Sequence, residues 1–238
     1  MEDEAALRES LSGSLPEPIE PEESPLWPQH LVDIFLRPRN FFSSQLTLGK
    51  TPYILLVTWI YGMAHTIDRI DQNLLRAELG RPRPGWNILS SYILESWIYY
   101  WAFLLGFGAL SGLIIWYVGG WWFQVRLRWA GAKDADRILA RLVYIYSSFV
   151  MAGPIVLLAL IQSFLFANYR EAWNAEESWS MITLIFPFWS CVSSYCGVTT
   201  LFSVKKFKTL MWFVILPSIF YVLALGVIAT LLLLFRGS

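Results

Sequence analysis

Five apolar runs follow one another from residue 51 onwards, separated by short polar segments. A transmembrane helix needs about 20 mostly apolar residues to cross a hydrocarbon core about 30 Å thick. The runs predict spans over about 51–66, 97–125, 142–167, 179–204 and 209–235. The pattern therefore predicts an all-α integral membrane protein whose transmembrane domain, residues 51–236, is a bundle of five helices. A break at Gly106 and Gly108 in the second run would give six spans instead.

The chain before the first span falls into two parts. Residues 1–26 are rich in proline and glutamate and predict a disordered acidic tail, because they cannot bury enough apolar surface to offset the entropy of ordering. Residues 27–50 predict an interfacial segment. In it, apolar side chains recur at helical spacing up to Pro38, with Arg37 and Arg39 beside the break. This segment fits either a short helix in the membrane interface or a turn packed on the membrane domain.

Composition narrows the class of protein. Of the 238 residues, 56% are hydrophobic and 15% are charged, whereas about 25% of a soluble domain is charged. An ordinary soluble enzyme, a disordered chain and a basic nucleic-acid binder are therefore excluded. The net charge of zero is divided along the chain: residues 1–50 hold nine acids and four bases, and residues 51–238 hold nine acids and fourteen bases.

The placement of the basic residues predicts the orientation in the membrane. With five spans, twelve lysines and arginines fall on the side of the N-terminal region and of the loops 126–141 and 205–208, and six fall on the opposite side. Cytoplasmic loops carry the excess of lysine and arginine. We therefore expect a cytoplasmic N-terminus and a C-terminus on the outside.

Small residues mark two of the predicted spans. Ser190, Ser194 and Gly197 belong to a mostly small or weakly polar stretch of the fourth span, which predicts either a closely packed central helix or the wall of a polar path. Gly108 and Gly112 form a GxxxG pair in the second span, which predicts a close contact within the chain or with a second copy. Pro154 lies in the middle of the third span.

No arrangement of residues indicates catalysis. The sequence has no GxSxG, P-loop or HExxH motif, and its histidines are His30 and His65. His65 and Asp68 could hold a proton or a metal, but apolar residues alternate with them, so an amphipathic continuation of the first helix is favoured. The predicted spans contain no paired carboxylates and no buried basic residues. We therefore expect neither an enzyme nor a cofactor or metal site.

The predicted cytoplasmic surface carries the candidate binding residues. They are Arg126, Arg128, Lys133, Arg137, Arg141, Lys205, Lys206 and Lys208. Bases at this level could bind anionic lipid headgroups at about 1 kcal/mol each. The alternative is the ordinary excess of positive charge that orients a membrane protein.

Three features resemble the Yip family, membrane proteins named for their interaction with Ypt/Rab GTPases and with relatives in bacteria. They are the pre-membrane stretch DIFLRPRNFF (33–42), the passage from Gly131 to Leu160 with Tyr146, Ser147 and Pro154, and the order of an N-terminal tail before five clustered spans. The tail shows no aromatic-proline trafficking signature and the loop after the first span is long. Both departures are more like a bacterial relative, and the resemblance therefore implies a location in a bacterial inner membrane.

The resemblance implies a protein that acts through partners and without chemistry of its own. The resulting hypothesis is a scaffold or accessory subunit in membrane organisation, lipid handling or trafficking. Its partners would be anionic membrane lipids and a membrane protein or a second copy of the chain, with no nucleic acid. The alternative is a channel or lipid-transport component whose path is lined by the fourth span.

Overall fold

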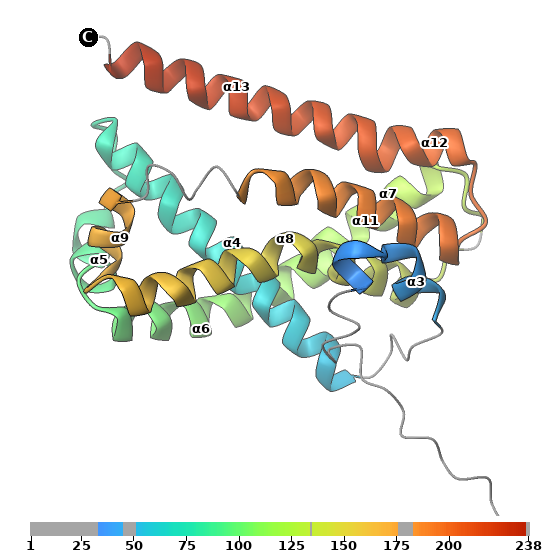
Figure 1. Cartoon of the computed structure of the whole chain (residues 1–238), viewed down its shortest axis with the longest axis horizontal. Coiled ribbons are helices and arrows are strands. Elements are labelled where there is room, and N and C mark those ends of the chain that lie inside the picture. Colours follow the sequence, from blue (N-terminus) through green and yellow to red (C-terminus); the bar gives the residue numbers. More distant parts are fainter. Residues whose placement is uncertain (1–32, 45–50, 134, 176–182, 237–238) are drawn as a thin grey trace, which may run out of the picture.

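The computed structural model describes residues 33–44, 51–133, 135–175 and 183–236, and every regular element in these ranges is a helix (Figure 1). The all-helical prediction is therefore confirmed for the described part of the chain. The acidic tail over residues 1–26, most of the interfacial segment 27–50 and the first residues of the predicted fourth span lie outside it.

Three described stretches are long and apolar enough to cross a membrane: Trp97–Trp129, Arg137–Leu165 and Lys206–Val227. The first consists of α6 (Trp97–Ile114), a π-helical turn η1 (Ile115–Gly119) and α7 (Gly120–Trp129). The second is α8 (Arg137–Leu165). The third begins with α12 (Lys206–Leu210) and η2 (Met211–Ile215) and continues into α13 (Leu216–Arg236). These helices support a membrane-embedded protein.

The helix that contains the second predicted span is unbroken. It continues through Gly106 and Gly108 and ends only at Trp129, so the alternative of six spans is wrong. The loop predicted over residues 126–141 is correspondingly shorter, because α7 extends to Trp129 and α8 begins at Arg137. Gly131, with φ at 98°, stands just after the end of α7, where a left-handed residue ends a helix readily.

Two further helices belong to the predicted bundle. The first, α4 (Thr51–Glu78), continues well beyond residue 66. Ile67, Ile70 and Leu74 are buried on one side of this extension while Asp68 and Arg69 are exposed, which confirms the amphipathic continuation. The second, α11 (Ile185–Leu201), has 17 residues and is therefore about 25 Å long.

The helices pack as a bundle with two distinct ends. α4 crosses α6 and α8, and α11 lies along α8 (Figure 1). The short helices α5 (Trp86–Ile93) and α9 (Tyr169–Ala175) lie at one end, and α7 and α12 lie at the other. We call these the α5–α9 end and the α7–α12 end. α13 lies on the outside, and most of the apolar side chains described between Leu216 and Val227 are exposed.

At the α5–α9 end, a ring stack, a hydrogen bond and a salt bridge hold the short helices against the bundle. The rings of Tyr100 and Tyr169 stack with centroids 4.4 Å apart. Trp97 Nε1 donates to the carbonyl of Phe166 at 2.8 Å. Glu95 pairs with Arg170 at 2.8 Å, and both side chains are about half exposed. Glu95 therefore lies at the surface of this end.

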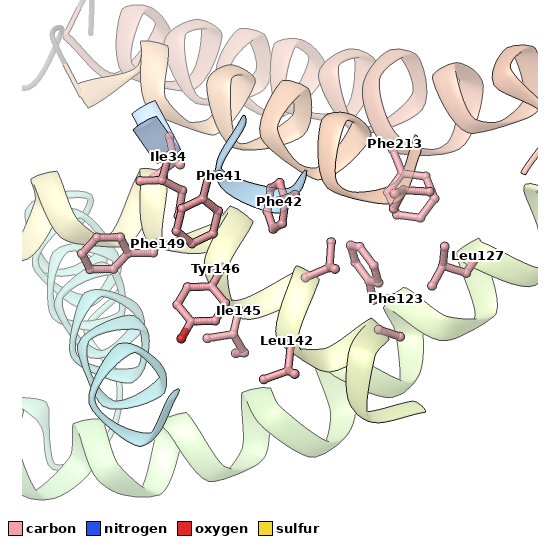
Figure 2. Close-up of a cluster of buried hydrophobic side chains, with 14 of the residues drawn as sticks. Ile34, Phe41, Phe42, Phe123, Leu127, Leu142, Ile145, Tyr146, Phe149 and Phe213 are labelled. Atoms are coloured by element: carbon pink, nitrogen blue, oxygen red, sulfur yellow. The ribbon is translucent and has the colours of Figure 1, made fainter. Parts of the chain in front are cut away.

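The pre-membrane segment packs into the core (Figure 2). Residues 33–36 are helical, Arg37 interrupts the helix, and α3 (Pro38–Ser43) follows with proline in its first turn. Ile34, Phe41 and Phe42 are at most 2% exposed and belong to one buried cluster with side chains of α8. α3 contacts α11, and the ring of Phe41 lies 5.5 Å from that of Tyr146 in α8. Of the two interpretations of this segment, the structure favours a turn packed on the membrane domain over a helix with its apolar face in lipid.

Candidate functional site

The small residues of α11 are occupied by packing contacts. Ser194 Oγ donates to Ser147 Oγ of α8 at 2.8 Å. A Cβ added to Gly197 would lie 2.7 Å from Val143 and 3.0 Å from the ring of Phe42. At Ser194 and Gly197, α11 is therefore packed directly on α8 and α3. Ser190 and Pro154 are half-buried, and Pro154 stands inside the unbroken helix α8.

The GxxxG pair of α6 makes its close contact within the chain. A Cβ on Gly108 would lie 2.6 Å from the Met63 side chain of α4, and one on Gly112 would lie 2.9 Å from the Thr58 carbonyl. The partner of both glycines is Gly62, which sequence reasoning missed. The contact lies between α4 and α6, so the pair needs no second copy of the chain to explain it.

Two of the eight candidate basic residues turn inward. The guanidinium of Arg141 lies over the rings of Trp116 and Tyr117, with centroids 5.9 and 5.3 Å away. Its stem covers Gly120, where an added Cβ would lie 2.5 Å from Arg141 Cγ. Cation–π contact holds such a charge against an aromatic surface. Arg141 is therefore part of the packing between α8 and α7, and its expected place on an open loop is wrong.

Arg126 is the second base that turns inward. Its guanidinium lies 4.8 Å from the ring centroid of Phe213 and 5.3 Å from that of Phe123. Its Nε is inaccessible and has no hydrogen-bond partner among the described residues. Arg126 lies just past the predicted span 97–125, but α7 continues to Trp129 and holds the half-buried arginine against Phe213 of η2.

Arg128 and Lys208 line one open groove of about 600 Å³ at the α7–α12 end. Its other lining residues are Trp129, Met211, Trp212 and Leu216. The rings of Trp129 and Trp212 meet with centroids 4.5 Å apart, and Trp122 packs edge-on against Trp129 at 5.4 Å. The groove thus combines two cations with an aromatic wall and an apolar floor.

Lys133 and Lys205 line a separate pocket of about 490 Å³ at the same end. The backbone N–H of Lys205 donates to the carbonyl of Ala130 at 3.1 Å, which ties the start of α12 to the end of α7. Arg137 and Lys206 are exposed and line neither pocket. Of the eight candidates, two arginines therefore turn inward, two bases line the groove, two line the separate pocket, and two are exposed outside both.

The groove is lined by residues from two helices that are far apart in the sequence. Arg128 and Trp129 end α7, whereas Lys208 and Trp212 belong to the turns that begin the C-terminal helix. The spacing of Trp129 after Arg128 and of Trp212 after Lys208 was the signal available in the sequence. The sequence-predicted candidates include Arg128 and Lys208 but neither tryptophan, and local spacing could not show that the two helices face one another here.

Comparison of the chain with family models, with curated proteins and with solved structures finds no match. The fold of a helical bundle does not by itself imply a function. The functional argument therefore rests on the residues of the groove and their geometry.

Proposed function

We propose that the chain is a multi-pass membrane protein of the Yip type that serves as a scaffold or accessory subunit. It would act in membrane organisation, lipid handling or trafficking, through anionic lipids or protein partners. The observation that carries the proposal is the groove lined by Arg128, Lys208, Trp129 and Trp212. Cations beside tryptophans are typical of side chains at the lipid headgroup level. The groove suits an anionic headgroup with its acyl chain against Met211 and Leu216.

The proposed topology has five spans: α4, α6 with α7, α8, α11, and α12 with α13. Supporting it, α4 is about 42 Å long and can cross the core while strongly tilted, as its oblique course in Figure 1 suggests. The twofold excess of bases on the side of the α7–α12 end favours a cytoplasmic N-terminus and an outside C-terminus in a bacterial inner membrane.

Packing of the pre-membrane segment on α8 and α11 also supports a Yip-type arrangement. The two stretches that carry the resemblance meet in the core, where the rings of Phe41 and Tyr146 lie 5.5 Å apart. Phe35 contacts Phe149 with centroids 6.5 Å apart, and its carbonyl accepts from Trp189 Nε1 at 2.6 Å. This contact would hold the start of the membrane domain in a fixed position for partners on the same side.

Neutralising the groove is expected to weaken binding of anionic lipid. In the double variant Arg128→Gln/Lys208→Gln, the affinity for phosphatidylglycerol in detergent is expected to fall by about 2 kcal/mol, roughly 30-fold, since each base contributes about 1 kcal/mol. Native mass spectrometry of a lipid titration measures this change directly.

The matched control is Arg137→Gln/Lys206→Gln, which removes the same charge from exposed positions at the same end. Its affinity is expected to change less than threefold. Equal losses in the two double variants would mean that the bases only orient the protein, and the lipid-binding role of the groove would be refuted.

A further inference from the structure

We propose that the α5–α9 end holds a second lipid site, which takes one anionic phospholipid with its phosphate between Arg69 and Arg83. The proposal shares with the proposed function only the placement of the chain in a membrane. It rests on a pocket of about 380 Å³ between α4, the turn before α5, and α6. This volume lies within the range of ligand-binding pockets in proteins.

The turn before α5 fixes one wall of the pocket. Gly80 and Gly85 have φ of 70° and 77°, values that favour glycine. The N–H of Trp86 donates to the carbonyl of Arg83 at 3.0 Å, and Trp86 itself is only 6% exposed. The buried tryptophan thus anchors the segment that carries Arg83 at the edge of the pocket.

The charge in the pocket is positive. Arg69 and Arg83 are among its lining residues, and no acid lines it in the part of the chain that the structure describes. Of the nearby acids, Asp68 accepts from Gln72 at 2.8 Å and Glu78 accepts from Trp173 Nε1 at 2.6 Å. Arg69 donates to the neutral amide oxygen of Gln72 at 3.1 Å. Two guanidinium groups therefore favour a phosphate as their partner.

The apolar wall of the pocket runs along a membrane-spanning helix. Phe103 and Phe107 of α6 stack with centroids 4.3 Å apart, and Phe107 is 50% exposed. Counted from Trp97, they lie about 9 and 15 Å along the helix. Ile70 and Leu89 complete this wall. A headgroup at the arginines would therefore have its acyl chain on the two phenylalanines, which a free phosphate could not use.

The two arginines and the apolar wall of the pocket favour an anionic phospholipid over zwitterionic and neutral lipids. A zwitterionic phospholipid has the same phosphate but carries a cation that the two arginines repel. A neutral lipid offers no anionic group for the charge-assisted hydrogen bonds of the two guanidinium groups. An anionic phospholipid satisfies both the charge and the apolar wall.

Site-resolved photo-crosslinking tests the proposal on the full-length protein. The probe is phosphatidylglycerol with a diazirine in its acyl chain, and peptide mass spectrometry locates the adduct. We expect an adduct in the 98–111 segment of α6. Its yield below saturation is expected to fall roughly 30-fold in Arg69→Gln/Arg83→Gln, the same loss as for the two bases of the groove.

The control Arg76→Gln/Arg81→Gln removes the same charge from the same end at positions that do not line the pocket. It is expected to change the yield less than threefold. Equal losses in both variants, or an adduct displaced as well by glycerol phosphate as by phosphatidylglycerol, would overturn the proposal. The yield at Met211–Leu216 in the same sample reports the α7–α12 groove, so a failure of one site is distinguished from a failure of the other.

Discussion

Replacing Gly62 by alanine is expected to lower the free energy of unfolding by about 3 kcal/mol, at the upper end of the cost of overpacking a core. An added Cβ would lie 2.0 Å from the carbonyl oxygen of Gly108 and 2.5 Å from the backbone nitrogen of Gly112. Backbone atoms of a helix cannot move aside as a flexible side chain can. α4 and α6 must therefore separate, and the packing between them is lost along the crossing.

Thermal unfolding in mild detergent, followed by circular dichroism, measures the effect. At roughly 2–4 °C for each kcal/mol in a chain of this size, the melting temperature is expected to fall by roughly 6–12 °C. The control is Gly106→Ala on the same helix as Gly108, where an added Cβ meets nothing within 4 Å. Alanine there is expected to be neutral or slightly stabilising. Equal melting temperatures for the two variants would contradict the close contact of α4 with α6.

Replacing Phe42 by alanine is expected to cost about 3–4 kcal/mol, as for other buried phenylalanines. The Phe42 side chain is 1% exposed, and its ring packs edge-on against Phe41 with centroids 5.1 Å apart. It also covers Gly197 of α11. Its removal leaves a cavity between the pre-membrane segment and the bundle, and the segment loses its main anchor.

Limited proteolysis and thermal unfolding together report this loss. Phe42→Ala is expected to unfold at a lower temperature and to be cut faster between residues 33 and 44. The control is Leu36→Ala in the same segment, where the side chain is 71% exposed. It is expected to change the free energy of unfolding by less than about 0.5 kcal/mol. A segment that lies free in the interface would be cut equally fast in both variants, contrary to the packed arrangement.

The class of the fold could be read from the sequence, because hydropathy over a long window depends on neighbouring residues alone. The helices from Trp97 and from Arg137 were predicted on this basis, and both proved apolar enough to cross a membrane. The extension of α4 followed from the spacing of Ile67 and Ile70. Local patterns of this kind are the strongest signal that one sequence offers.

The pairings between helices could not be read in the same way. Gly62 has no motif of its own, and its importance comes from Gly108 and Gly112 on another helix. Arg126 and Arg141 look like ordinary loop bases until Phe213 and Trp116 are placed beside them. Helical periodicity shows which residues share a face, but it does not show which face of another helix they meet.

The central claim of the account is that the α5–α9 and α7–α12 ends lie on opposite sides of the membrane. Figure 1 places α9 and α12 at opposite ends of the bundle, and Ala175 and Lys206 are exposed there. The direct test is cysteine labelling in intact cells, with Ala175→Cys and Lys206→Cys each made in a background that lacks Cys191 and Cys196. We expect an impermeant maleimide to label position 175 from outside and position 206 only after permeabilisation. Labelling of both positions from the same side would contradict the account.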